Sequence, residues 1–274
     1  MSYEQYRPQR FQILPPVVKN LLIINVLMFL ATLVVQNRFG IDLNDKLGLH
    51  YFTNSKFRPY QIVTYMFMHG GFGHILFNMF ALWMFGNMLE NYWGGKRFFI
   101  FYMVCGIGAA LVQQAVATGE FYYLQHILNN YAISPDPASF YDIVSKHFSE
   151  YKNSPDILDL FNNGSKYSDF NVQSGHVLDQ LLGFRKDIDV IGASGAIFGV
   201  LLAFGMLFPN TLLYVYFIMP IKAKYFVIIY GAIELYSGIT NHPGDNVAHF
   251  AHLGGMLFGF ILIKYWQKNS SNFY

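Results

Sequence analysis

Charged residues are scarce in this sequence. Asp, Glu, Lys and Arg make up 12% of its 274 residues, about half of the share that is usual in a soluble domain. Hydrophobic residues make up 54%, more than a water-soluble fold of this size can use, which indicates a protein that crosses a membrane several times. The net charge of +2 is too small to indicate a nucleic-acid partner. Cys105 is the only cysteine, so no intrachain disulfide can form, and we expect it to be buried in a helix.

The apolar residues gather in six segments. A membrane-spanning helix needs about 20 mostly apolar residues, so we predict an all-α polytopic membrane protein with six transmembrane helices. The segments cover approximately residues 17–35, 73–88, 98–117, 192–208, 223–238 and 247–266. The sequence before the first segment lacks the apolar core and cleavage site of a removable signal peptide, so this segment is expected to stay as an anchor.

Basic residues lie at both ends of the chain and in every second connection between the segments. Such residues gather on the cytoplasmic side of membrane proteins. They are Arg7, Arg10, Lys19, Lys96, Arg97, Lys222, Lys224, Lys264 and Lys268. The first outer loop weakens this pattern, because it also carries Arg38, Lys46, Lys56 and Arg58. We predict that both termini are cytoplasmic. The low charge and the lack of a targeting tail favour a bacterial inner membrane, with a eukaryotic organelle as the alternative.

A polar stretch separates the third segment from the fourth. It is rich in Asn, Ser, Asp and Tyr, and short amphipathic patterns predict a few helices within it. Long loops are translocated largely regardless of charge, so we place this insertion outside, as a spacer, a lid or a docking element. The predicted domains are a cytoplasmic tail (1–16), helices one to three with the first outer loop (17–118), the extracytoplasmic insertion (119–190), helices four to six (191–267) and a cytoplasmic tail (268–274).

Polar side chains inside a membrane are costly, which makes them candidates for function. Ser194 opens the fourth segment between Gly192, Ala193 and Gly195, which leave its backbone uncrowded. A position near a helix N-terminus favours a developing negative charge. A serine among small residues also commonly serves helix packing alone, so this motif by itself leaves both interpretations open.

Two histidines, His249 and His252, open the sixth segment. Glycines follow His252 at +3 and +7 and share its helix face, and a second glycine pair follows Ser194 on the fourth segment. These glycines are Gly255 and Gly259 on the sixth segment and Gly195 and Gly199 on the fourth. Facing glycine stripes let two helices approach closely in lipid. If these two helices pack together, His252 lies beside Ser194 and can accept its proton.

A third polar cluster lies at the outer end of the second segment. His74 and Asn78 are four residues apart, and therefore on one helix face. Two side-chain donors there can stabilise an oxyanion together with the Ser194 main-chain N–H. His69, in the preceding glycine-rich loop, is expected to brace that loop. All three clusters lie at the outer ends of their segments, and this convergence at one depth favours catalysis over packing.

These motifs resemble those of the rhomboid intramembrane serine proteases. The resemblance covers residues 17–266 without the insertion, and rests on His-x-x-x-Asn, Gly-x-Ser-Gly and Ala-His-x-x-Gly-x-x-x-Gly. It implies Ser194 as nucleophile, His252 as general base, and His74, Asn78 and the Ser194 main-chain N–H as oxyanion contacts. It assigns supporting positions to Gly192, Gly195, Phe198, Gly199, Gly255 and Gly259. His249 also follows an alanine, but it lacks the two glycines, so His252 is preferred as the base.

The sequence departs from the family pattern in three places. Tyr60 and Gln61 stand where the family often has Trp-Arg, which affects the anchoring of the first outer loop. Phe198 stands where a tyrosine is common; it can stack on His252 but cannot form a hydrogen bond with it. The insertion is unusually long, and it ends just before the nucleophile, so it is a candidate cover for the site.

No acidic residue is expected to complete a catalytic triad. Asp245 lies seven residues before His252, about 10 Å along the axis if both are helical. Glu234, the single acid of the fifth segment, is interpreted as a packing or capping contact. The prediction is therefore a two-residue dyad in which stacking and packing alone orient the base.

The resemblance implies an endopeptidase that cleaves single-span transmembrane substrates near the outer face, within the lipid bilayer, without a metal or another cofactor. Helical substrates must unwind first, which favours Gly, Pro or small residues near the cut. The alternative is an inactive member of the family that binds transmembrane helices. A zinc site of His69, His74, His249 and His252 is disfavoured, because no His-Glu-x-x-His motif occurs and no acid is expected at that depth. A transporter is the general alternative for any six-span chain.

Overall fold

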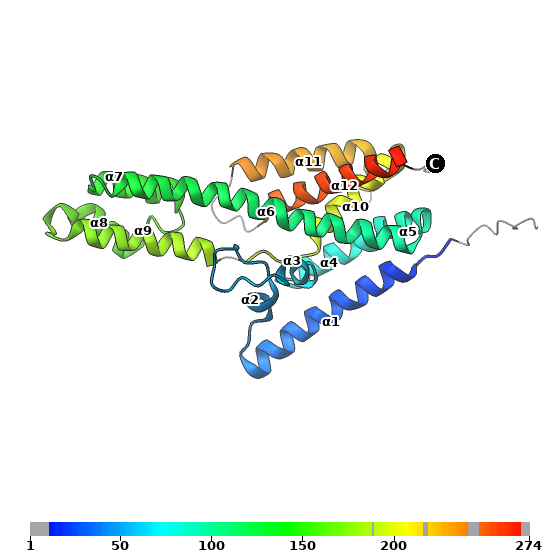
Figure 1. Ribbon diagram of the computed structural model, residues 1–274, viewed down its shortest axis with the longest axis horizontal. Helices are drawn as coiled ribbons and strands as arrows, with labels where there is room; N and C mark the ends of the chain where they lie inside the picture. The colour runs from blue at the N-terminus through cyan, green and yellow to red at the C-terminus, as the bar shows by residue number, and fades with distance from the viewer. Residues whose placement is uncertain (1–10, 188, 216–218, 241–246, 270–274) are drawn as a thin grey trace, which may run out of the picture.

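The computed structural model describes residues 11–187, 189–215, 219–240 and 247–269 (Figure 1). It is mostly helical, with one short β-hairpin. In chain order, the elements are α1 (Pro16–Phe39), α2 (Leu43–Leu47), α3 (Gln61–Thr64), η1 (Tyr65–Phe67), α4 (Phe72–Ala81), η2 (Leu82–Gly86), α5 (Asn87–Trp93), α6 (Gly95–Tyr131), α7 (Pro137–His147), α8 (Pro155–Asn163), η3 (Gly164–Lys166), α9 (Phe170–Asp187), α10 (Ser194–Leu207), β1 (Leu212–Val215), β2 (Met219–Lys222), α11 (Ala223–Thr240) and α12 (His249–Asn269).

Three helical stretches in the described part of the chain are long and apolar enough to cross a membrane. They are α1, the continuous stretch α4–η2–α5 and α6. Helix α10 is apolar but has 14 residues, about 21 Å of helix. Helices α10, α11 and α12 nevertheless lie where the fourth to sixth segments were predicted. The chain is thus a mainly helical membrane protein, and the count of six spans stays a prediction.

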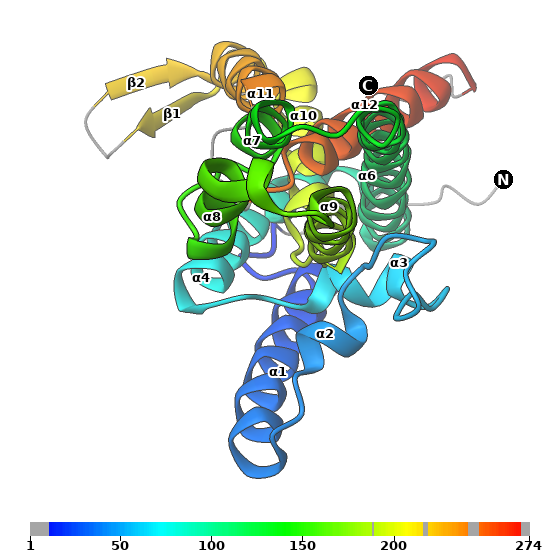
Figure 2. The same cartoon turned by 90° about the vertical axis from the view of Figure 1, so that its left-hand side faces the viewer.

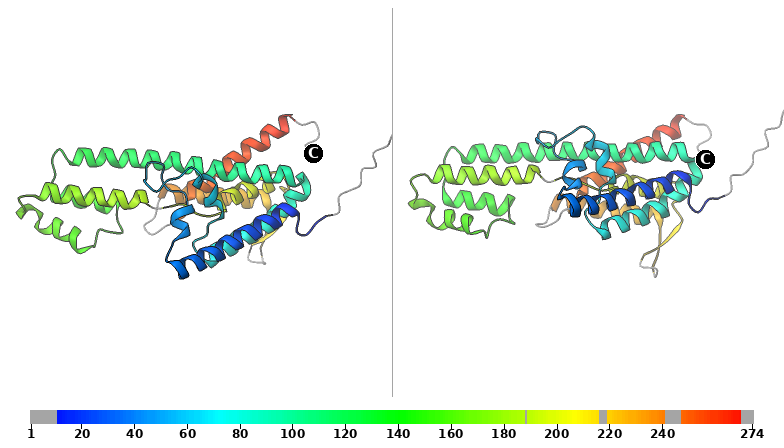
Figure 3. Two further views of the ribbon diagram at one scale, coloured as in Figure 1. Left: turned by 60° about the horizontal axis from the view of Figure 1, so that its bottom comes forward. Right: turned by 90° about the horizontal axis from the view of Figure 1, so that it is seen from below.

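Successive long helices run in alternate directions (Figures 1 and 3). The N-termini of α4, α10 and α12 therefore point toward the same end of the molecule, the end that also carries α7, α8 and α9. The opposite end is fixed by a buried carboxylate, because Glu90 of α5 accepts hydrogen bonds from the main-chain N–H groups of Val17 (2.9 Å) and Val18 (2.7 Å). These N–H groups at the start of α1 have no partner within their own helix. The alternation brings the predicted site residues to one end.

Helix α6 is far longer than the third predicted segment. It has 37 residues and continues to Tyr131, so the predicted boundary at residue 119 falls inside it. At about 56 Å it exceeds the hydrocarbon core of a bilayer, which is about 30 Å thick. Figure 3 shows α9 running beside its C-terminal part. The helix continues because apolar residues keep facing one side beyond residue 119, where Phe121, Leu124, Leu128 and Tyr131 are all buried.

The buried apolar residues form two separate clusters. One lies in the bundle of α1, α4, α5, the N-terminal part of α6, α10, α11 and α12. The other lies where the C-terminal part of α6 meets α7, α8 and α9, which we call the second lobe. Figure 2 shows this lobe end-on, with α1 slanting away from it and the β1–β2 hairpin projecting beside α11. The predicted helices of the insertion thus form a small packed unit of their own.

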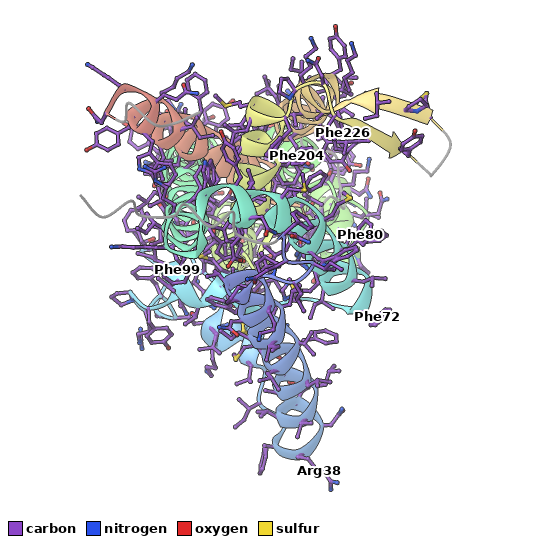
Figure 4. The ribbon with its side chains drawn as sticks, turned by 90° about the vertical axis from the view of Figure 1, so that its right-hand side faces the viewer. Arg38, Phe72, Phe80, Phe99, Phe204 and Phe226 are labelled. Atoms are coloured by element: carbon purple, nitrogen blue, oxygen red, sulfur yellow. The ribbon has the colours of Figure 1, made fainter. Side chains whose placement is uncertain are left out.

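Large apolar side chains cover the outside of the bundle. In Figure 4, Phe72, Phe80 and Phe99 lie on its periphery, and they are 71%, 46% and 48% exposed. Phe204, by contrast, is 3% exposed and belongs to the buried cluster. Apolar surface of this extent is unfavourable in water, so it agrees with a bundle that is embedded in lipid.

Gln61 anchors the first outer loop from a buried position. Its Nε2 donates hydrogen bonds to the carbonyl oxygens of Lys46 (3.2 Å) and Lys56 (3.1 Å), and its Oε1 accepts one from the Arg58 N–H (3.1 Å). Tyr60, the other residue that departs from the family pattern, is 50% exposed. The loop therefore has an anchor here, and the amide of Gln61 provides it.

Candidate active site

The chain is held firmly just before it enters α10. Val190 and Leu49 exchange two main-chain hydrogen bonds of 2.9 Å, and the Gly192 N–H donates to the Tyr65 carbonyl oxygen (2.9 Å). Gly192 has a φ of 128°, a conformation that residues with a side chain rarely adopt. This turn makes Ser194 the first residue of α10, where main-chain N–H groups lack partners within the helix.

Ser194 and His252 are hydrogen-bonded to each other. The Ser194 Oγ lies 2.8 Å from the Nε2 of His252, which is 8% exposed. This is the separation that proton transfer between a nucleophile and its base requires. The two residues come from α10 and α12, 58 positions apart in the sequence, so helix packing alone brings them together.

That packing is a contact of main chain against main chain. A Cβ atom on Gly255 would collide with the carbonyl oxygen of Gly195, and one on Gly259 would lie 3.4 Å from the Gly199 Cα. The four predicted glycines therefore lie where α10 and α12 cross. Helix α6 forms the third side, with the buried Cys105 against Gly199.

The ring of His252 is held by stacking. Phe198, one helical turn after Ser194, lies with its ring centroid 4.2 Å from that of His252 and the planes 6° apart. Phe198 thus forms the stacking contact that its position in the sequence allows. Tyr230 of α11 lies on the Phe198 ring as well, with centroids 5.9 Å apart.

The expectation that no acid reaches His252 is wrong. Glu234, which is 7% exposed, places its Oε2 2.9 Å from the Nδ1 of His252 and 2.6 Å from the Nδ1 of His249. It is therefore more than a packing or capping contact. The prediction considered distance along the chain, whereas the acid comes from the neighbouring helix, α11, which packs against α12. Asp245, the other acid considered, lies outside the described residues.

These contacts determine which ring nitrogen of His252 carries the proton. A carboxylate only accepts hydrogen bonds, so the Nδ1 beside Glu234 must be the N–H donor. The Nε2 of the neutral ring is then left with a free lone pair, which faces the Ser194 hydroxyl. This is the tautomer that a general base toward Ser194 requires.

His74 of α4 approaches the same place from the other side of Ser194. A Cβ atom on Gly192 would lie 2.7 Å from the His74 Nε2 and 3.5 Å from the Ser194 Oγ, so the missing side chain keeps the space between them open. The Gly70 N–H donates to the His74 Nδ1 (3.4 Å), which leaves Nε2 as the N–H donor. His69 packs edge-on against His74, with ring centroids 5.0 Å apart.

Asn78 lies one turn further along α4 and is 7% exposed. Its Nδ2 is buried and has no hydrogen-bond partner among the described residues. Buried amide donors normally have a partner, so this atom is available to a bound group. Asn78 and His74 thus lie on the same helix, α4, as predicted. The described residues show no direct contact between Asn78 and Ser194.

Glu234, His249 and His252 also form the one group of potential metal ligands found in the described residues, with ligand atoms within 4.8 Å of one another. The zinc hypothesis considered above therefore does have an acid at that depth, contrary to expectation. The two nitrogen–oxygen separations, 2.6 and 2.9 Å, are those of hydrogen bonds. Two ligands of one tetrahedral zinc ion lie about 3.3 Å apart. The geometry thus favours a hydrogen-bonded group.

A cavity of about 440 Å³ lies beside this group. It is bordered by α6, the end of α9, the end of α11 and the start of α12, and His249 lines it together with polar side chains. These polar side chains are Gln113, Glu120 and Arg185. Because of them the cavity can hold water within reach of His249.

Comparison with known proteins identifies the family. The rhomboid domain model matches residues 56–123 and 171–268, which is more than half of the chain. The chain is therefore a member of the rhomboid family, as the motifs indicated.

Two relatives carry names that agree with this assignment. An uncharacterized mitochondrial rhomboid protein of Schizosaccharomyces pombe is 24% identical over 225 residues, which are 78% of this chain and 53% of that protein. A rhomboid-like protein of Arabidopsis thaliana is 30% identical over 112 residues, 39% of this chain and 28% of that protein. The chain thus spans about half of the first relative's length and less than a third of the second's.

Proposed function

We propose that this protein is an intramembrane serine endopeptidase that cleaves transmembrane segments of other proteins. The observation that carries the proposal is the 2.8 Å hydrogen bond between the Ser194 Oγ and the His252 Nε2. Helix packing alone does not require this contact. Ser194 is the first residue of α10, and its hydroxyl faces the unprotonated nitrogen of a histidine that is buried and stacked. Such a pair is the usual device for making a hydroxyl nucleophilic at neutral pH.

In the proposed reaction, Ser194 attacks the peptide carbonyl carbon while His252 takes the hydroxyl proton. A tetrahedral intermediate forms, and its negative charge lies on the former carbonyl oxygen. His252 then gives the proton to the leaving amine, the C–N bond breaks, and an acyl-enzyme remains. A water molecule then attacks the acyl carbon while His252 takes its proton. The bond to the Ser194 Oγ breaks, His252 returns the proton to this oxygen, and the second product leaves as a carboxylic acid.

The oxyanion is assigned to donors on two helices. The His74 Nε2–H and the Asn78 Nδ2 come from α4, and the Ser194 main-chain N–H comes from the start of α10, where the helix dipole adds to their effect. Removing one donor from an oxyanion hole typically lowers kcat by about 10²–10³-fold. The cavity beside His249 is the proposed source of the hydrolytic water.

The proposed substrates are single-span membrane proteins with Gly, Pro or another small residue near the outer face. A regular helix hides its carbonyl groups, so only a segment that unwinds easily can present one to Ser194. We also propose six spans with both termini cytoplasmic. For the membrane itself, the composition favours a bacterial inner membrane, whereas the name of the yeast relative favours an organelle; cell fractionation decides between the two.

The direct test is labelling of the full-length protein in detergent with a fluorescent fluorophosphonate, followed by cleavage of a single-span substrate in proteoliposomes. The proposal expects wild type to be labelled, and both labelling and cleavage to be lost in Ser194→Ala and His252→Ala. A folded wild type that neither reacts nor cleaves would refute the proposal in favour of an inactive family member that binds transmembrane helices.

A further inference from the structure

Glu234 is the buried polar group whose place in this site neither the motifs nor the family match assigns. It lies in α11 among apolar residues and is 7% exposed. A carboxylate at such a position is costly unless it is fully paired. Here its Oε2 accepts hydrogen bonds from His252 (2.9 Å) and His249 (2.6 Å), both through Nδ1.

We propose that Glu234 is the positioning residue of the base, so that Glu234, His252 and Ser194 act as a triad. This inference rests on the proposed function. The carboxylate keeps the proton of the neutral His252 ring on Nδ1, which leaves Nε2 unprotonated for the Ser194 hydroxyl. It also stabilises the imidazolium that forms when His252 takes the proton, because the negative charge lies beside the positive ring.

His249 supports this arrangement as a second donor to Glu234. Its Nδ1 donates to the same carboxylate oxygen, so Oε2 is fixed between two rings of one helix. Among the residues that the structure describes, the ionisable groups that face His252 are Glu234 from α11, His249 from α12 and His74 from α4. Of these, Glu234 alone is an anion. Stacking on Phe198 fixes the plane of the ring, but only the carboxylate fixes its tautomer.

The first test compares Glu234→Gln with wild type in the full-length protein. The side-chain amide of glutamine can donate to Nδ1, which moves the ring proton to Nε2 and removes the acceptor for Ser194. We expect kcat for a single-span substrate to fall by about 10²–10⁴-fold, as for the equivalent change in other triads, with KM nearly unchanged. Glu234→Asp keeps the charge and should recover part of kcat. An unchanged kcat in folded Glu234→Gln overturns the inference.

Glu90→Gln is the matched control. Glu90 is a second buried carboxylate, 4% exposed, and it serves a main-chain capping role at the far end of the bundle. Its replacement should lower thermal stability and leave kcat of the folded fraction as it is. If Glu234→Gln behaves in the same way, Glu234 is structural only. A wild type that loses labelling to a zinc chelator and regains it with zinc overturns the inference too, because the three side chains then hold a metal.

A spectroscopic test works without any activity. The proton shared by His252 and Glu234 should give a strongly downfield NMR resonance that persists in Ser194→Ala and in His249→Ala, which removes the other proton bound to this carboxylate, and disappears in Glu234→Gln. If wild type is labelled but lacks this resonance, the inference fails while the proposed function holds. If the resonance is present but wild type is never labelled, the proposed function fails, and with it the catalytic use of Glu234.

Discussion

The bundle and the second lobe are both helices around a buried apolar core, but they pack in different ways. In the bundle, α10 and α12 touch main chain to main chain through glycines, so that a Cβ on Gly255 has no room. In the second lobe, large side chains fill the space between helices. They include Phe140, Phe148 and Phe170, with the rings of Phe140 and Phe170 edge to face at 6.3 Å.

The difference is the one expected if the bundle lies in lipid and the second lobe in water. Lipid tails are as apolar as leucine, so burying apolar side chains gains little in a bilayer, and helices associate through close packing and polar contacts. In water, burial of apolar area itself stabilises the fold. The bundle accordingly buries a carboxylate, Glu234, with two histidines, whereas the second lobe keeps a charged pair such as Lys146 with Asp142 exposed. A reactive hydroxyl is best fixed where main chains are in contact.

The largest expected effect distinguishes two serines, one in each region. Ser194→Ala should abolish substrate cleavage, a loss of at least about 10⁴-fold, because the hydroxyl is the proposed nucleophile. Ser174 in α9 is fully buried and accepts a hydrogen bond from the Tyr131 hydroxyl (2.7 Å). Ser174→Ala should leave cleavage unchanged and cost about 1–2 kcal/mol of stability, since the tyrosine loses its acceptor. Cleavage rates and thermal unfolding of the two variants measure these effects. A loss of cleavage in Ser174→Ala would contradict the expectation that only the serine of the bundle takes part in cleavage.

The second prediction asks whether the two cores unfold separately. Phe140 is fully buried in the second lobe, so Phe140→Ala should destabilise that lobe by about 3–5 kcal/mol. Hydrogen exchange should rise in α7–α9 and stay slow in α10 and α12, while Ser194 still reacts with fluorophosphonate. Phe161, which is 38% exposed, provides the control, and Phe161→Ala should have a much smaller effect. Loss of labelling in folded Phe140→Ala would mean that the second lobe also holds the site together.

The third prediction applies one substitution to both regions and expects opposite signs. Gly199→Ala places a Cβ 2.9 Å from the Gly255 carbonyl oxygen and against Cys105, so it should destabilise the bundle by about 1–3 kcal/mol and slow cleavage. A Cβ on Gly183, in the C-terminal part of α9, meets nothing within 4 Å. Gly183→Ala should therefore stabilise the second lobe by about 0.5–1 kcal/mol, because alanine is the better helix former. Unfolding in urea or by heat measures the change in stability of each variant. If both substitutions change the stability in the same direction, the contrast between the two regions is refuted.

Much of the bundle could be predicted from the sequence, because its signals are local. Apolar runs gave the positions of the long helices, and residues three, four and seven apart placed glycines beside Ser194 and His252. Such spacing determines which residues share a helix face. The end of α6 was predicted wrongly, because the sequence changes in average hydropathy before the helix ends. Its apolar stripe continues past residue 119 while polar residues fill the other face, so the average hydropathy falls although the helix does not end.

Glu234 could not be placed because its partners lie on another helix. Spacing along one segment says nothing about which face of α11 meets α12, and no pattern in the sequence fixes that rotation. One feature of the sequence nevertheless indicated a contact. A single acidic residue in an otherwise apolar segment is costly in a membrane unless it is paired with a hydrogen-bond donor. Two histidines opening the next segment were the available donors.

The smallest expected effect concerns the joint between the two regions. The Lys56 Nζ lies 2.8 Å from the Asp45 Oδ1 and 2.9 Å from the Asp187 Oδ2, which links the first outer loop to the end of α9. These hydrogen bonds to Lys56 lower the pKa of both carboxyl groups below their ordinary 3.8. A lowered pKa means that the link is present at neutral pH and is lost as the pH falls below about 3.8. All three groups are partly exposed, so the link should also weaken in high salt.

Spin labels on Ser55→Cys and Gly183→Cys can follow this joint by electron paramagnetic resonance distances, because the native Cys105 is buried. We expect a narrow distance distribution at pH 7 that broadens at pH 3, and a broad one at both values in Lys56→Gln. Lys146→Gln is the matched control, because the Lys146–Asp142 pair lies within α7 and joins nothing. If Lys56→Gln leaves the distribution narrow at pH 7, the remaining contacts position the second lobe against the first outer loop, among them the hydrogen bonds from the Asn54 Nδ2 to the Lys186 carbonyl oxygen (3.0 Å) and the Asp187 Oδ1 (3.1 Å). The two regions are then coupled without the charge of Lys56.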